Sequence, residues 1–89
     1  MTLLMGRSLA GHDKGQVYVI LREEGQNYIL ANGTNRSVLS PKRKNEKHIQ
    51  MIKNFPEEVL DISKEENDYR DLWVKRVIRI YNDSVTNNS

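Results

Sequence analysis

The sequence predicts a mainly β fold in which a small five-stranded barrel is followed by one C-terminal amphipathic helix. Short runs of β-forming residues alternate with glycine- and asparagine-containing turns at intervals of about 8–12 residues in the first part of the chain. Beyond Pro56 the apolar residues change to helical spacing. The 89 residues suffice for one domain, which we divide into a barrel over residues 1–55 and a linker, helix and tail over residues 56–89.

The five strands are expected where β-branched, aromatic and other apolar residues cluster between turn signals. The clearest pair is a hairpin, since the run from Val17 to Leu21 and the run from Tyr28 to Ala31 flank a turn containing Gly25. Asn32-Gly33 is a turn dipeptide, because both residues tolerate a positive φ. The expected strands therefore cover residues 6–10, 16–21, 28–31, 37–39 and 49–52.

A single amphipathic helix is expected over residues 64–81. Ser63 and Glu66 have the spacing of a capping box, in which each side chain bonds to the other residue's backbone N–H. The apolar stripe that follows consists of Tyr69, Leu72, Trp73, Val77 and Ile80, widened by Val74, Ile78 and Tyr81. Trp73 is expected to pack the helix onto the barrel, with a partner-binding helix as the alternative. Residues 82–89 are expected to form a frayed tail.

Composition excludes several kinds of site. The chain has no cysteine, which removes disulfides, thiolate catalysis and cysteine-ligated zinc, and fits a reducing cytoplasm. Its two histidines have no ligand spacing around them, so we expect no metal and no other cofactor. No nucleophile or oxyanion-hole motif is present, so we expect no enzyme. No apolar run approaches the roughly 20 residues of a membrane span, so no membrane partner is expected.

Charge is distributed unevenly along the chain. Residues 1–55 hold nine Lys/Arg and four Asp/Glu, a net of +5, whereas residues 56–89 hold five and eight, a net of −3. The basic residues concentrate in the stretch from Pro41 to His48. Clustered cations gain affinity for nucleic acid by releasing condensed counterions, so this asymmetry indicates that the first part meets a polyanion.

Two segments resemble a known family. Gly6-Arg-Ser-Leu-Ala-Gly11-His-Asp-Lys-Gly15, followed by Val17-Tyr-Val-Ile20, resembles the KOW motif, in which a loop with a key glycine joins two strands. Asn32-Gly33, Arg36 and Pro41-Lys-Arg-Lys-Asn-Glu-Lys-His48 then look like the small bacterial KOW-domain proteins related to eukaryotic and archaeal large-subunit ribosomal proteins. The resemblance covers about residues 4–53 and implies an SH3-like barrel that binds structured RNA, often ribosomal RNA.

The expected RNA-binding residues come from the glycine loop and the basic stretch. We expect the basic side chains to be exposed in a loop, where the alternative is a solvated loop that only aids solubility. At Gly15 the missing side chain lets backbone N–H groups reach a phosphate, or merely permits a tight turn. The candidate RNA-binding residues are Lys14, Gly15, Arg36, Lys42, Arg43, Lys44, Lys47 and His48.

These observations predict a non-enzymatic, cytoplasmic RNA-binding protein, ribosome-associated in one version of the hypothesis. Charge and a backbone loop offer little that reads base edges, so recognition should depend on RNA shape and phosphate position. The alternative is a protein–protein interaction module of the translation or transcription machinery, which would bind its partner through the C-terminal helix.

Overall fold

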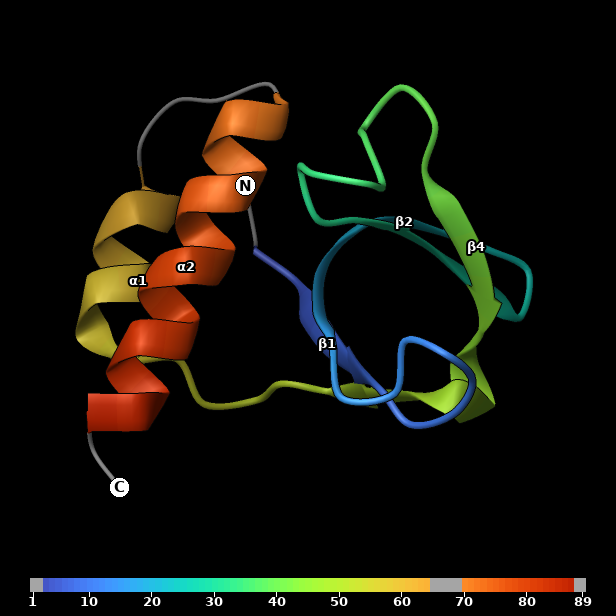
Figure 1. Ribbon diagram of the computed structural model, residues 1–89, viewed down its shortest axis with the longest axis horizontal. Coiled ribbons are helices and arrows are strands. Elements are labelled where there is room, and N and C mark those ends of the chain that lie inside the picture. Colours follow the sequence, from blue (N-terminus) through green and yellow to red (C-terminus); the bar gives the residue numbers. More distant parts are fainter. Residues whose placement is uncertain (1–2, 65–69, 88–89) are drawn as a thin grey trace.

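The computed structural model describes residues 3–64 and 70–87, and the chain forms a five-stranded sheet covered on one side by two helices (Figure 1). The elements, in chain order, are β1 (Met5–Ser8), β2 (Val17–Glu24), β3 (Asn27–Ala31), β4 (Lys42–Asn45), the short 3-10 helix η1 (Glu46–His48), β5 (Ile49–Met51), α1 (Glu57–Ser63) and α2 (Asp71–Asn87). In these described ranges no helix combines the length and apolarity that a bilayer crossing requires.

The sheet is antiparallel throughout, in the order β4-β3-β2-β1-β5. The first four strands follow one another as neighbours, and β5 returns to pair with β1. A register shift between Ile20 and Arg22 lets β2 bend, as bulges generally do. The strands curl in Figure 1, but the edge strands β4 and β5 are not paired, so the sheet is not closed as the expected barrel would be.

The two faces of the curled sheet bury separate apolar clusters. Along β2, Val17 and Val19 join the cluster under the helices, whereas Tyr18 and Ile20 belong to a second cluster on the inner face. Burial on both faces explains why this strand has no polar alternation. At Gly6, a Cβ would lie 2.5 Å from a methyl group of Ile49, so the tight curl of the inner face requires glycine there.

The fourth strand was predicted in the wrong place. Residues 37–39 form part of a loop and turn, and the strand is instead the basic segment β4. Lys and Asn are poor strand formers, which is why propensity missed it. The strand forms because β3 offers a free edge, with Leu30 opposite Lys42 and Tyr28 opposite Lys44.

Two helices replace the single expected one. Ser63 is the last residue of α1, where its Oγ donates to the Leu60 carbonyl at 2.7 Å, and not the residue that precedes a helix, as was expected. Glu66 and Tyr69 lie outside the described residues.

In α2, the predicted apolar stripe is largely buried. Val74, Val77 and Tyr81 are buried and Trp73 is half-buried, but Leu72 is 78% exposed. The helix also continues to Asn87, because burial of Tyr81 and packing on α1 carry it through the segment predicted to fray.

The N-terminal turn of α2 docks on the loop between β3 and β4. The Asp71 carboxylate accepts hydrogen bonds from the Ser37 hydroxyl at 2.6 Å and from the Val38 N–H at 2.8 Å. Gly33 has a φ of +79°, and a Cβ on it would lie 2.5 Å from the Asp71 carbonyl oxygen. The loop backbone therefore touches the helix backbone directly, which fixes the helix relative to the sheet.

Candidate nucleic-acid interface

The turn between β1 and β2 (residues 9–16) is organised by its own backbone hydrogen bonds. The N–H groups of Lys14, Gly15 and Gln16 donate to the carbonyls of Gly11, Ser8 and Asp13 at 3.2, 2.8 and 2.9 Å. These three N–H groups are thus already bonded within the turn, and a backbone phosphate contact at Gly15 stays a prediction. Gly15 serves the turn through its φ of +91°.

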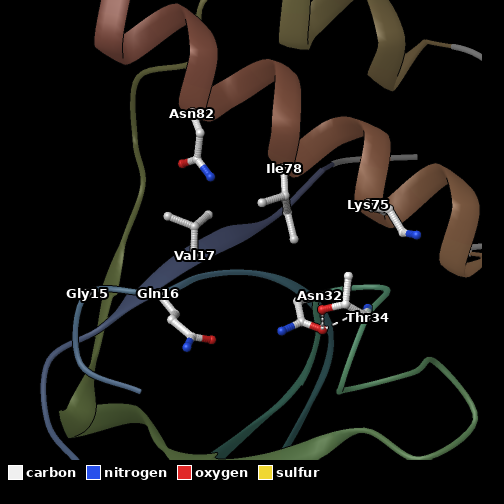
Figure 2. A pocket seen from close by; sticks show the side chains of 8 residues that line it. All are labelled: Gly15, Gln16, Val17, Asn32, Thr34, Lys75, Ile78 and Asn82. Atoms are coloured by element: carbon white, nitrogen blue, oxygen red, sulfur yellow. Dashed lines mark hydrogen bonds between the residues drawn. The ribbon is translucent and has the colours of Figure 1, made fainter. Parts of the chain in front are cut away.

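Gly15 also borders an open cleft of about 260 Å³ between this turn and α2 (Figure 2). One wall continues from Gly15 through Gln16 and Val17, and α2 supplies the other wall. Asn32 and Thr34 of the β3–β4 loop close one end. The α2 residues that line it are Lys75, Ile78 and Asn82.

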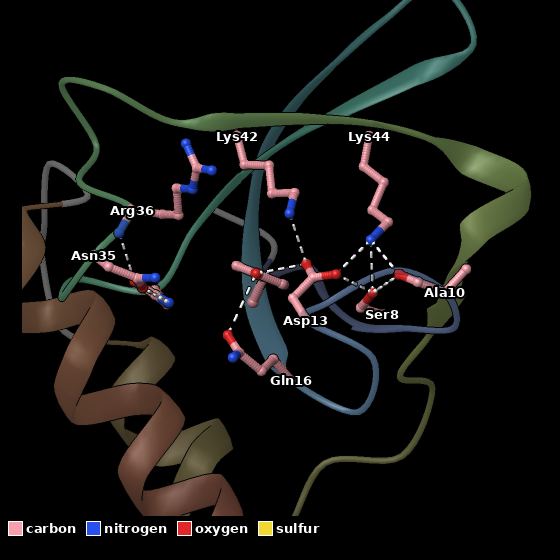
Figure 3. A network of polar contacts seen from close by, with 10 residues as sticks. Ser8, Ala10, Asp13, Gln16, Asn35, Arg36, Lys42 and Lys44 are labelled. Atoms are coloured by element: carbon pink, nitrogen blue, oxygen red, sulfur yellow. Dashed lines mark hydrogen bonds and ion pairs between the residues drawn. The ribbon is translucent and has the colours of Figure 1, made fainter.

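Asp13 is the centre of a buried polar network beside the same turn (Figure 3). Its carboxylate accepts hydrogen bonds from the Tyr18 hydroxyl at 2.7 Å and the Ser8 hydroxyl at 3.0 Å. From β4, the ammonium groups of Lys44 and Lys42 lie 2.6 and 3.1 Å from its oxygens. Lys44 also donates to the carbonyl of Ala10 at 2.7 Å, so β4 is fastened to the turn.

The network shifts the pKa values of its members. Burial alone would raise the pKa of Asp13, but hydrogen bonds from Lys44, Tyr18, Lys42 and Ser8 outweigh it and hold the pKa well below its usual range. Burial raises the pKa of Tyr18, and its hydrogen bond to the Asp13 carboxylate raises it further. At neutral pH the centre therefore holds an ionised carboxylate and a protonated phenol.

The predicted basic cluster does not form one exposed surface. Because side chains alternate along a strand, Lys42 and Lys44 face Asp13, and their side chains are only 26% and 11% exposed. Arg43 points to the other side and pairs with Glu24, which Arg22 also contacts. Lys47 is exposed in η1, and His48 is half-buried. The expectation that all four cations are exposed in a loop is therefore wrong for Lys42 and Lys44.

Several cations around the turn and the cleft form no salt bridge within the part of the chain that the structure describes. Arg36 lies beside the network in Figure 3, close enough for its charge to act on the Tyr18 hydroxyl. Lys14 is exposed in the turn, and Lys75 lines the cleft. Within residues 3–64 and 70–87, no carboxylate forms a salt bridge with any of these three side chains.

Two of the residues that shape this region were missed by sequence reasoning. Asp13 was not among the candidate residues, and nothing in its local sequence identifies the lysines about 30 positions later as its partners. Lys75 was missed because the net charge was summed over all of residues 56–89, which are acidic as a whole. Residues 70–81 alone are basic, since they contain Arg70, Lys75, Arg76 and Arg79 and only one acid, Asp71. A narrower charge window would have shown the basic side of α2.

The described part of the chain contains no group of three or more His, Asp or Glu side chains that could hold a metal ion. No family model and no curated protein matches the chain. The function is therefore argued from the geometry of the turn, the cleft and the charged side chains around them.

Proposed function

We propose that the protein is a non-enzymatic, cytoplasmic RNA-binding protein of the KOW type that binds structured RNA, ribosomal RNA included. The observation that carries the proposal is that Lys42 and Lys44 share one carboxylate, that of Asp13. The network thus retains one positive charge in excess. With Arg36, Lys14 and Lys75 around it, it forms a surface suited to phosphates, which we call the basic surface.

The strand arrangement supports an SH3-like barrel. A four-stranded meander whose fifth strand returns to the first is the order expected of that fold, and the inner face of this sheet has its own apolar cluster. The resemblance of residues 4–53 to the KOW motif assigns Gly15 to the key glycine, which here shapes the turn at the edge of the basic surface. Arg43 is left out of the basic surface because it points to the other side of β4 from Lys42 and Lys44, where it pairs with Glu24.

The test is RNA affinity as a function of salt. Structured ribosomal RNA fragments should bind with about four to six phosphate contacts, which gives a slope of log affinity against log salt of about −3 to −5. Replacing Lys14, Arg36 and Lys75 together by Ala should weaken binding and make the slope less negative by about 2–3. The matched control replaces three exposed cations that do not line the cleft or belong to the Asp13 network: Arg22, Arg43 and Lys64. If the first variant keeps wild-type affinity and slope, the proposal is wrong.

A protein-interaction module is the second candidate, favoured by two exposed leucines. Leu39 is 90% exposed and Leu72 is 78% exposed, and they adjoin the contact between Val38 and Asp71. Replacing both by Ser should leave RNA affinity unchanged. If that variant loses association with ribosomes or with transcription complexes while the triple Ala variant retains it, the second candidate replaces the first.

A further inference from the structure

The cleft between the β1–β2 turn and α2 combines three kinds of lining. Its middle is apolar, since Val17 and Ile78 point toward each other in Figure 2 and both pack in the cluster under the helices. Its rim carries the amide side chains of Gln16 and Asn82. Lys75 supplies one positive charge, and none of the described residues that line the cleft carries a carboxylate.

The amide side chains that line the cleft differ in how many hydrogen bonds they already make within the protein. Asn32 is occupied, because its Oδ1 accepts from the N–H and hydroxyl of Thr34 and from the Arg36 N–H, all at 3.0 Å, and its Nδ2 donates to Asn35. In contrast, the Asn82 amide makes no hydrogen bond to another described residue, and Gln16 only accepts a long one, at 3.4 Å, from Tyr18. Gln16 and Asn82 therefore offer donors and an acceptor to a ligand.

The size and chemistry match one nucleotide. A cavity of about 150 Å³ holds a benzene molecule, so about 260 Å³ of open cleft has room for a single base but not for two. A base has an apolar face for Val17 and Ile78 and a hydrogen-bonding edge for the two amides. The phosphate of the nucleotide can pair with Lys75, which forms no salt bridge with a described carboxylate.

We infer that this cleft binds one unpaired nucleotide extruded from the RNA, with its base on Val17 and Ile78, its edge bonded to Gln16 and Asn82, and its phosphate at Lys75. The inference rests on the proposed function and adds to it. Phosphate contacts on the basic surface would hold a helical RNA segment, whereas the cleft would select segments with a bulged or unpaired nucleotide.

The experiment compares a perfect RNA duplex with the same duplex carrying one unpaired adenosine. The bulged duplex should bind about tenfold more tightly, because the two amides form hydrogen bonds to the base edge. A tenfold gain in affinity is about what two such hydrogen bonds contribute together. Replacing Gln16 and Asn82 by Ala should remove this preference and leave affinity for the perfect duplex unchanged. The control replaces two exposed amides outside the cleft, Gln26 and Asn54, and should keep the preference.

A second arm uses adenosine monophosphate alone, followed by backbone amide chemical shifts. Millimolar nucleotide should shift the signals of Gly15, Thr34 and Ile78 in the wild type and not in the Gln16→Ala/Asn82→Ala variant. If neither duplex binds, the proposed function fails and the inference about an RNA nucleotide fails with it, even where the shifts show that the cleft holds free adenosine monophosphate. If both duplexes bind equally, or if the preference survives in the variant, the proposed function stands and the inference is overturned. Absence of both the preference and the shifts also overturns it.

Discussion

At the scale of single residues, Asp13 connects parts of the chain that are far apart in sequence. Ser8 and Tyr18 belong to β1 and β2, and Lys42 and Lys44 to β4, so one carboxylate fastens three strands to the turn. A buried charge is tolerated only when it is paired and hydrogen-bonded, and here each requirement is met several times. Basic residues that sequence reasoning assigned to RNA alone thus also stabilise the fold.

Replacing Asp13 by Asn should destabilise the protein by about 3–5 kcal/mol, because it leaves the partly buried ammonium groups of Lys42 and Lys44 without a compensating charge. Urea unfolding followed by circular dichroism measures the loss. Asp61→Asn is the control: its carboxylate is 66% exposed and 3.9 Å from Lys64, so the change should stay within about 0.5 kcal/mol. A cost below about 1 kcal/mol for Asp13→Asn would mean that the network contributes little to stability.

Stability should also fall in acid partly through Asp13. Its pKa is lower in the folded protein than in the unfolded chain, so the unfolded chain binds the proton more readily. The contribution is complete above the ordinary Asp value of about 3.9 and is lost as pH falls below it. Melting temperatures between neutral pH and about pH 2 should drop less for Asp13→Asn than for the wild type. Parallel pH curves for the two proteins would contradict this assignment.

At the scale of elements, sequence periodicity located the helix and the β-rich hairpin but not β4. Val74, Val77 and Tyr81 are buried at the predicted spacing because burial along one stripe determines a helix. The strand β4 has no such signature, since its inward face is made of lysines and its pairing depends on β3 and Asp13. A strand that is held by distant partners cannot be found from local propensity.

The contact between the β3–β4 loop and α2 can be tested at Gly33. Gly33→Ala should cost at least about 2 kcal/mol, because the new Cβ would meet backbone atoms of Asp71 and Lys75 in addition to the strain of a positive φ. Gly25→Ala is the matched control, with a φ of +63° and nothing within 4 Å of the added Cβ. The difference between the two free energies of unfolding measures the packing. If Gly33→Ala and Gly25→Ala destabilise the protein equally, the loop can move away from α2 without loss of packing energy.

For the whole molecule, the change of pattern at Pro56 marks a change of secondary structure within one shared core. The apolar cluster under the helices includes Met5, Val17 and Val19 from the sheet together with Val59, Ile62, Val74, Val77 and Tyr81 from the helices. The sequence indicated which side chains are apolar, but it could not show that β2 is buried on both faces. That depends on how the sheet curls and on where α1 and α2 pack (Figure 1).

A chain that ends after Phe55 should therefore fail to fold. The five buried helix side chains each contribute roughly 1.5–3 kcal/mol, which together matches the whole margin of about 5–15 kcal/mol by which a domain is stable. Without the helices, the sheet face at Met5, Val17 and Val19 would also be left open to water. Backbone amide spectra of residues 1–55 should lack dispersion, and adding residues 56–89 as a separate peptide should restore it. The control chain ends at Thr86, retains every helix residue of the cluster and should melt close to the wild type. Cooperative unfolding of residues 1–55 alone would show that the inner cluster around Tyr18 and Leu30 suffices as a core.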